Sequence, residues 1–201
     1  WVDAVYCLQT QWEKPVRVAG LTSVALQGYA HYTEPAGRQQ IWLTLPAYVK
    51  LPGWFVVFEP SAMFVTLYTS GLTVDIPSFT TQLKIGDRQL VGSVPELAAY
   101  EIACGVPSLI SFEHADALFQ GMNLLSPRKL QALLFASHSV KTNRVMLYLA
   151  RRNEHPYFQY LDQSGIETGS GKRQIVPGGW LEPDYQITVP RAFKPEGVED
   201  G

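Results

Sequence analysis

Hydrophobic and polar positions near the start of the chain follow a helical period. Apolar residues three and four positions apart predict a helix over residues 3–12. They predict a second helix that a Thr22 or Ser23 side chain caps and that continues to Tyr32. The residues between these two helices, 16–20, read as a short strand or loop.

The pattern then changes to short runs of β-branched and aromatic residues, which are typical of strands. These runs predict strands over residues 40–45, 54–58 and 64–68. Ser70-Gly71 is a turn signal, so residues 64–76 are predicted to form a hairpin. Gly86-Asp87 lies between two short apolar runs and predicts a second hairpin.

After Gly92 the helical period returns and is accompanied by capping signals. Helices are predicted from Pro95 to Cys104, after caps at Ser111 and Ser126, over residues 140–152 and, briefly, over 156–161. Residues 172–189 return to strands, which Pro177-Gly178-Gly179 separates. We therefore expect a mixed α/β (α+β) fold. It comprises a small mixed sheet in residues 1–92, a helical lobe in residues 93–201 and a closing strand pair at the C-terminal end.

Composition and charge restrict the class of protein. The 201 residues are 46% hydrophobic and 17% charged, which is typical of a folded chain, and the net charge is −2. Any affinity for nucleic acid must therefore be local. Between Arg128 and Arg173 there are eight basic and three acidic residues, whereas from Glu182 onward acidic residues outnumber basic ones.

The helix over residues 140–152 concentrates this positive charge. At 100° per residue, the side chains of Lys141, Arg144, Tyr148, Arg151 and Arg152 fall within a sector of about 100°. Such a face suits a phosphate backbone or an acidic protein surface, and a solvated amphipathic helix is the alternative. Four further basic residues flank it in the sequence: Arg128, Lys129, Lys172 and Arg173.

Other chemistry has weaker signals. Gly169-Ser170-Gly171-Lys172-Arg173 lacks the spacing of a nucleotide-hydrolysing P-loop, although its backbone N–H groups can face an anion. The four histidines, His31, His114, His138 and His155, have no metal-ligand spacing, so no metal or cofactor is expected. We interpret His31 as a packed residue and His155 as the residue that begins a helix.

The sequence contains no GxSxG motif, the nucleophile elbow that would indicate nucleophilic catalysis. A metal-dependent nuclease requires converging carboxylates, for which Glu59 and Asp75 are the candidates. Cys7 and Cys104 are interpreted as buried thiols in a reducing cytoplasm, and no apolar run is long enough to span a membrane.

Several segments resemble the AbiEi antitoxins of bacterial type IV (abortive infection) toxin–antitoxin systems. In chain order they are Gly20 to Tyr32, Leu125 to Leu134, Ser139 to Ala150, His155 to Phe158, Gly169 to Val176 and Tyr185 to Pro190. Their order and spacing carry the resemblance, which covers residues 1–190.

The resemblance implies a two-domain antitoxin. Family members carry an N-terminal winged-helix domain that binds operator DNA and represses the operon, and that domain is expected to lie before Trp1. The remaining antitoxin domain is associated with neutralising a nucleotidyltransferase-like toxin, without a requirement for direct contact.

From this resemblance we expect a cytoplasmic antitoxin domain of a transcriptional autorepressor, without enzymatic activity, cofactor or membrane contact. Its partners are operator DNA and, functionally, the toxin. Two alternatives remain: a nuclease or nucleotidyl-processing enzyme that uses Glu59 or Asp75, and a scaffold that binds an acidic protein.

Overall fold

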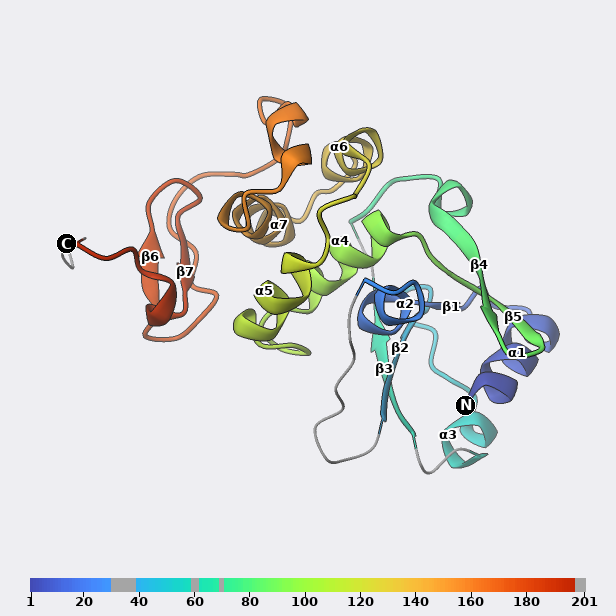
Figure 1. Ribbon diagram of the computed structural model, residues 1–201. Helices are drawn as coiled ribbons and strands as arrows, with labels where there is room; N and C mark the ends of the chain where they lie inside the picture. Colours follow the sequence, from blue (N-terminus) through green and yellow to red (C-terminus); the bar gives the residue numbers. More distant parts are fainter. Residues whose placement is uncertain (30–38, 59–61, 69–70, 198–201) are drawn as a thin grey trace. The chain divides into compact units, whose positions relative to one another are not determined.

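The computed structural model describes residues 1–29, 39–58, 62–68 and 71–197, and these residues form two compact units (Figure 1). The first unit comprises residues 1–70 and 74–101, and the second comprises residues 71–73 and 102–201. Their mixed α+β architecture confirms the fold class expected from the sequence. The boundary expected near residue 92 stays a prediction.

A five-stranded mixed sheet forms the centre of the first unit. Its strands are β1 (Arg17–Val18), β2 (Gln39–Thr44), β3 (Ala62–Leu67), β4 (Thr80–Ile85) and β5 (Arg88–Ser93). They lie in the order β3-β2-β1-β5-β4. The β1–β2 and β4–β5 pairs are antiparallel, whereas β2–β3 and β1–β5 are parallel. The β4–β5 hairpin confirms the turn predicted at Gly86-Asp87.

Helices cover both faces of this sheet because side chains alternate along each strand. Helices α1 (Val2–Gln11) and α3 (Gly53–Phe58) pack on the face of Ile41 and Leu43. On the opposite face, α2 (Gly20–Leu26) lies over Trp42. A side chain at Gly20, where φ is +41°, would come within 2.5 Å of the Trp42 ring, so only glycine fits this close approach.

Two predictions about the helices of this unit were wrong. Residues 54–58 form α3 rather than a strand. The run is apolar at every position and fits either period; Phe55 is buried, whereas Trp54 and Val57 are exposed. Neither Thr22 nor Ser23 caps the second helix, because both hydroxyls bond to the sheet. The Trp42 N–H donates to the Thr22 hydroxyl, and the Ser23 hydroxyl donates to the Ser93 carbonyl oxygen.

The hairpin predicted over residues 64–76 was also wrong. β3 pairs with β2 in parallel, and residues 71–73 belong to the second unit. There Leu72 bridges to Ser137, and Thr73 N–H donates to Ala136 O. Several residues named above, namely His31, Tyr32, Glu59 and Ser70, lie outside the described residues.

The second unit is built mainly from helices, two of which begin at the caps predicted at Ser111 and Ser126. They are α5 (Phe112–Gln120), α6 (Pro127–Phe135) and α7 (Val140–Arg152), and they follow α4 (Pro95–Gly105), which begins in the first unit. Ser111, Ser126 and Ser139 cap the three helices, each accepting a backbone N–H bond from three residues ahead. Two short 3₁₀ helices, η2 (Pro156–Tyr160) and η3 (Arg191–Phe193), follow later in the chain.

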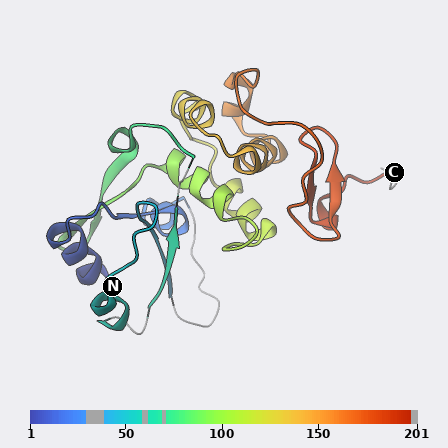
Figure 2. The same ribbon diagram turned by 180° about the vertical axis from the view of Figure 1, so that it is seen from behind.

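A strand pair, β6 (Trp180–Glu182) and β7 (Ile187–Val189), closes this unit and lies beside α7 in both Figure 1 and Figure 2. The predicted first strand, at Gln174 to Val176, is absent from the strands of the described chain. These residues instead run along β7, where the Ile175 and Val176 amides donate to the Thr188 hydroxyl. β6 starts only after the Pro-Gly-Gly turn.

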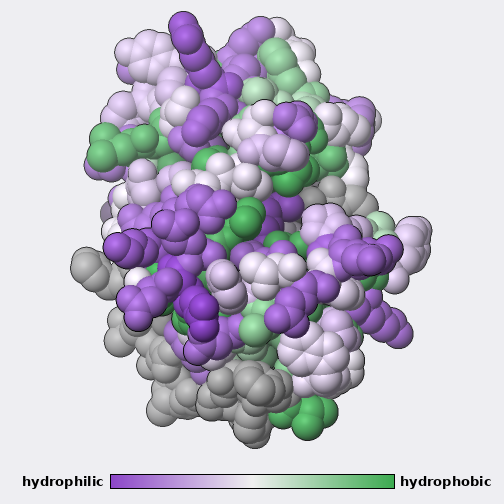
Figure 3. Space-filling model, turned by 90° about the vertical axis from the view of Figure 1, so that its right-hand side faces the viewer, coloured by the Kyte–Doolittle hydropathy of each residue, from purple (hydrophilic) through white to green (hydrophobic). Residues whose placement is uncertain are grey.

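The surface, the two cysteines and the lengths of the helices bear on the remaining expectations from the sequence. On the face drawn in Figure 3, hydrophobic side chains form small groups among hydrophilic ones. Cys7 and Cys104 are thiols that are half-buried, not fully buried as expected. None of the helices in the described residues is both long enough and apolar enough to cross a membrane.

Candidate functional site

Helix α7, on which the sequence places most candidate residues, is the buried central helix of the second unit. Nine consecutive residues, Thr142 to Ala150, are buried. A helix enclosed on nearly every side presents little surface to a macromolecule. Other parts of the same unit cover much of the polar face of α7 and supply partners for its cations.

Lys141 serves as a bridge to the end of α4. Its Nζ donates to the carbonyl oxygen of Cys104 at 2.7 Å and also to that of Val106. The last carbonyls of a helix have no partner within the helix, and an ammonium group near them interacts favourably with the helix dipole. Burial lowers the pKa of Lys141. The side chain thus joins two segments of the unit.

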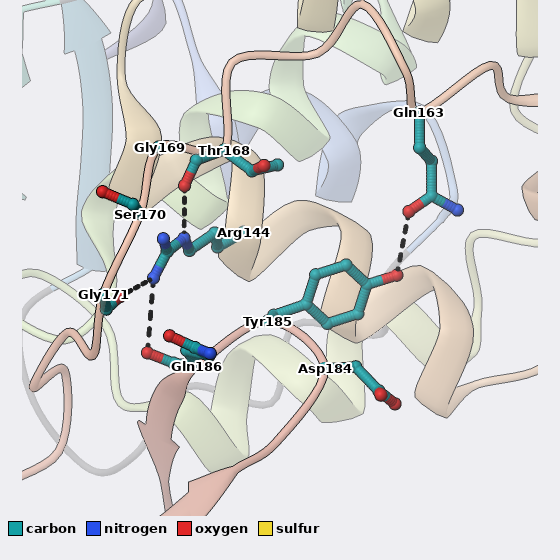
Figure 4. A pocket seen from close by; sticks show the side chains of 9 residues that line it. All are labelled: Arg144, Gln163, Thr168, Gly169, Ser170, Gly171, Asp184, Tyr185 and Gln186. Carbon is teal, nitrogen blue, oxygen red and sulfur yellow. Dashed lines mark hydrogen bonds between the residues drawn. The ribbon is translucent and has the colours of Figure 1, made fainter.

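Arg144 is the most enclosed of the candidate cations, with an exposed fraction of 3%. Its Nε donates to Thr168 O at 2.5 Å, and Nη1 donates to Gly171 O at 2.7 Å and Gln186 O at 3.3 Å (Figure 4). Burial lowers the pKa of Arg144, and the positive charge of Arg173 lowers it further. The guanidinium ties the 168–171 loop to the β6–β7 turn.

Arg151 is paired with two carboxylates, one at the end of β6 and one in the β6–β7 turn. Its Nη2 lies 2.6 Å from the buried Glu182 carboxylate, and its Nη1 donates to Asp184. The guanidinium also lies 5.0 Å from the centre of the Tyr185 ring. These acidic residues follow the basic segment in the sequence, and the fold brings the two together.

The last two candidates of α7 also have internal contacts. Arg152 lies 3.3 Å from Asp116 of α5, and its guanidinium stacks 3.8 Å above the Phe193 ring. Tyr148 belongs to the core, edge-on to Phe112, and burial raises its pKa to about 12. The structure thus gives all five α7 candidates internal contacts, and their role in binding DNA or a partner stays a prediction.

The four flanking cations lie on the surface. Arg128 and Lys129 are exposed in the first turn of α6, and Lys172 and Arg173 are exposed in the loop after Gly171. Within the part of the chain that the structure describes, Lys172 and Arg173 form no ion pair. The side chains of Lys172 and Arg173 can therefore contact an external anionic surface without breaking an internal ion pair.

A cavity of about 350 Å³ lies beside Arg144 (Figure 4). We call it the Arg144 cavity. Its walls are formed by Arg144, Gln163, Thr168, Gly169, Ser170, Gly171, Asp184, Tyr185 and Gln186. Sequence reasoning identified Arg144 and the Gly-rich loop but missed Gln163, Asp184, Tyr185 and Gln186. No sequence pattern links these residues, because they are joined only through the fold.

A second cavity, of about 500 Å³, lies in the first unit at the end of β1 and β2. Most of its walls are apolar, and its charged residue, Arg17, is paired with Glu101 at 2.7 Å. That pairing leaves no uncompensated charge for a ligand. The Arg144 cavity is therefore the more distinctive of the two as a candidate site.

The carboxylates expected of a nuclease do not gather in the described residues. Asp75 precedes η1 (Ile76–Phe79), where its carboxylate accepts a bond of 2.6 Å from the Ser78 hydroxyl. Among the described residues, no three His, Cys, Asp or Glu side chains are grouped as metal ligands would be. His155, in agreement with its predicted place, caps η2 and stacks on Tyr157.

Comparison with known proteins adds a family and a fold. A family model described as "Transcriptional regulator, AbiEi antitoxin, Type IV TA system" matches residues 38–190. The crystal structure of the RV2827C protein from Mycobacterium tuberculosis is similar, with a TM-score of 0.58 and 20% sequence identity. That match covers 90% of this chain and 64% of the other, and at this identity it shows the fold alone. No curated protein matches the chain.

Proposed function

This chain belongs to the AbiEi family of antitoxin transcriptional regulators of type IV toxin–antitoxin systems, and we propose that it is the antitoxin domain that counteracts a nucleotidyltransferase-like toxin. The observation that carries the proposal is the family match over residues 38–190, which includes most of both units. In this proposal the protein acts through its surfaces and performs no catalysis. It works in the cytoplasm, where the operon and the toxin's targets are found.

Autoregulation is the second part of the proposal. In this proposal, a winged-helix domain of the kind carried by the family recognises the operator, and exposed cations of this chain strengthen the binding. The exposed cations Arg128, Lys129, Lys172 and Arg173 make the electrostatic contacts. A few such contacts suffice to make binding to DNA depend on salt concentration. The α7 residues with internal contacts support this surface from beneath: Lys141, Arg144, Tyr148, Arg151 and Arg152.

Growth rescue tests the antitoxin role. The full-length protein and its cognate toxin are expressed together, and growth is compared with toxin alone. We expect rescue by the intact protein and by a version in which this chain is joined to an unrelated DNA-binding domain. Rescue that depends only on the winged helix and survives removal of these residues contradicts the proposal.

Binding to duplex DNA across a salt series tests the electrostatic surface. The double variant Lys172→Glu/Arg173→Glu is compared with Lys14→Glu/Lys50→Glu, which makes the same change in charge at exposed positions of the first unit. We expect the first variant to weaken binding and reduce its salt dependence, and the second to have less effect. Equal effects of the two variants contradict a specific role for Lys172 and Arg173. An acidic protein as the true partner predicts salt-dependent binding to that protein and none to DNA.

A further inference from the structure

The Arg144 cavity encloses a positive charge that no carboxylate neutralises. All the hydrogen bonds that Arg144 makes in the described residues go to backbone carbonyls, those of Thr168, Gly171 and Gln186. Carbonyl dipoles satisfy donors but leave the net charge in place. Its other terminal nitrogen, Nη2, has no partner within the described residues and remains available to a ligand (Figure 4).

The loop beside Arg144 adds donors of the same kind. Gly169 and Gly171 have positive φ, at 60° and 76°, on either side of Ser170. Alternation of this sort turns successive N–H groups toward one side, as in anion-binding nests. Among the described residues, the N–H groups of Gly169, Ser170 and Gly171 have no protein acceptor. Lys172 and Arg173 follow immediately and increase the local positive charge.

The rest of the cavity wall is suited to the other end of a small polar molecule. Asp184 and the side chains of Gln163 and Gln186 offer hydrogen-bond acceptors and donors. Asp184 forms its ion pair with Arg151, and in the described residues no ion pair joins its carboxylate to the Arg144 guanidinium. A volume of about 350 Å³ is near the lower end of the range for ligand pockets, which favours a small ligand.

We propose that the Arg144 cavity binds the phosphate group of a small phosphate monoester whose remainder carries hydroxyl or amino groups. Arg144 Nη2 and the N–H groups of residues 169–171 bind the phosphate oxygens. Asp184, Gln163 and Gln186 bind the polar remainder. A nucleoside monophosphate has this chemistry, and so does the 5′-phosphate end of a nucleic acid strand. The inference stands apart from the proposed function, because neither DNA repression nor growth rescue is needed to observe it.

Calorimetry and NMR on the full chain test this proposal. The probes are AMP, adenosine, inorganic phosphate, and a short oligonucleotide with and without a 5′-phosphate. We expect AMP to bind and to shift the amide signals of residues 169–171, and adenosine to do neither. Tighter binding of the 5′-phosphorylated oligonucleotide than of AMP and of its unphosphorylated form identifies a strand end as the source of the phosphate. Inorganic phosphate that binds as tightly as AMP overturns the role given to Asp184, Gln163 and Gln186.

Two variants separate binding from folding. Ser170→Asp places a negative charge in the loop without removing any bond of Arg144, and it should weaken AMP binding by at least tenfold. Ser108→Asp makes the same change at an exposed position that does not line the cavity, and it should bind AMP as the unmodified chain does. Unchanged binding by Ser170→Asp, or no binding of any phosphorylated probe at millimolar concentration, overturns the proposal.

Discussion

In the described residues, Arg17 of the first unit and Arg144 of the second are both largely enclosed, but they meet different partners. In the first unit, Arg17 Nη2 lies 2.7 Å from the buried Glu101 carboxylate, which also accepts bonds from Gly20 N–H and the Ser93 hydroxyl. In the second unit, Arg144 meets only carbonyl oxygens. One charge is thus neutralised by a side chain inside the protein, and the other is left for the cavity beside it.

This difference separates a structural arginine from one that can also bind a ligand. Burial raises the pKa of Glu101, and the opposing effects of Arg17 and the Gly20 amide keep this carboxyl a partner for the guanidinium. A paired and fully bonded buried ion is stable but has nothing to offer a ligand. A buried cation surrounded by carbonyls holds its loop in place and still attracts an anion.

The largest expected effect comes from breaking the neutralised pair. Glu101→Gln keeps the shape of the side chain but leaves the charge of Arg17 without its carboxylate. We expect the free energy of unfolding to fall by about 3 kcal/mol. Urea denaturation followed by circular dichroism measures it.

A matched control is the exposed pair of Arg88 and Asp3, whose atoms are also 2.7 Å apart. Asp3→Asn should lower the free energy of unfolding much less than Glu101→Gln does, because solvent screens an exposed pair. Equal losses for Glu101→Gln and Asp3→Asn are incompatible with the role given to burial.

Removing Arg144 should lower the free energy of unfolding by less than Glu101→Gln does, because it leaves no unpaired charge. Arg144→Met leaves the Thr168 and Gly171 carbonyls without their donor, and we expect a loss of about 2 kcal/mol in the free energy of unfolding. Hydrogen exchange should accelerate most at the amides of Arg173 and Thr188, which join this loop to β7. Uniform acceleration across the unit argues against a local role for Arg144.

A smaller effect is expected on the pH dependence of stability, through the imidazole of His155. His155 is buried, burial lowers its pKa, and its Nε2 has no hydrogen-bond partner within the described residues. In the unfolded chain a histidine binds a proton near pH 6.5. The unfolded state therefore takes up this proton first as the pH falls. The stability that His155 contributes is complete above about pH 6.5 and declines below it toward the lowered pKa of the folded state.

Urea unfolding at several pH values, with the His155→Phe variant beside the unmodified chain, checks this prediction. The variant should lose less stability between pH 7 and pH 5. Parallel pH profiles for the two proteins exclude the contribution of His155.

The smallest expected change in stability comes from the surface. Lys172→Glu/Arg173→Glu should alter the free energy of unfolding by no more than about 0.5 kcal/mol, because both side chains are exposed and form no ion pair within the described residues. The same variant should weaken binding to DNA. A thermal unfolding scan measures the first property and shows whether the loss of binding reflects unfolding.

Local signals in the sequence were sufficient wherever a structure depends on neighbouring residues. Ser126 caps α6 as predicted, α7 spans the predicted 140–152, and Gly86-Asp87 makes a hairpin. The 54–58 run was misread because a short, wholly apolar segment fits a helix and a strand equally. The family was identified from the order of several segments, which no single motif could have supplied.

The candidate site was harder to predict because its bonds join distant parts of the chain. Arg144 meets Thr168 and Gln186, which are 24 and 42 residues away. The spacing of cations along α7 predicts a shared face, but it contains no information about which segments contact these side chains. Only the position of acidic residues after Glu182 hinted at partners for Arg151.

The central sheet of the first unit has a consequence for the order in which the chain folds. Strand β1 is two residues long, and it joins the β3–β2 pair to the β5–β4 hairpin. The hairpin needs only local contacts, whereas pairing Val18 with Gly92 closes a long loop at an entropic cost of roughly 4 kcal/mol. We therefore expect the hairpin to form early and the joining of the two halves at β1 to limit the folding rate. On the ribosome, the sheet cannot be completed until Gly92 has left the exit tunnel.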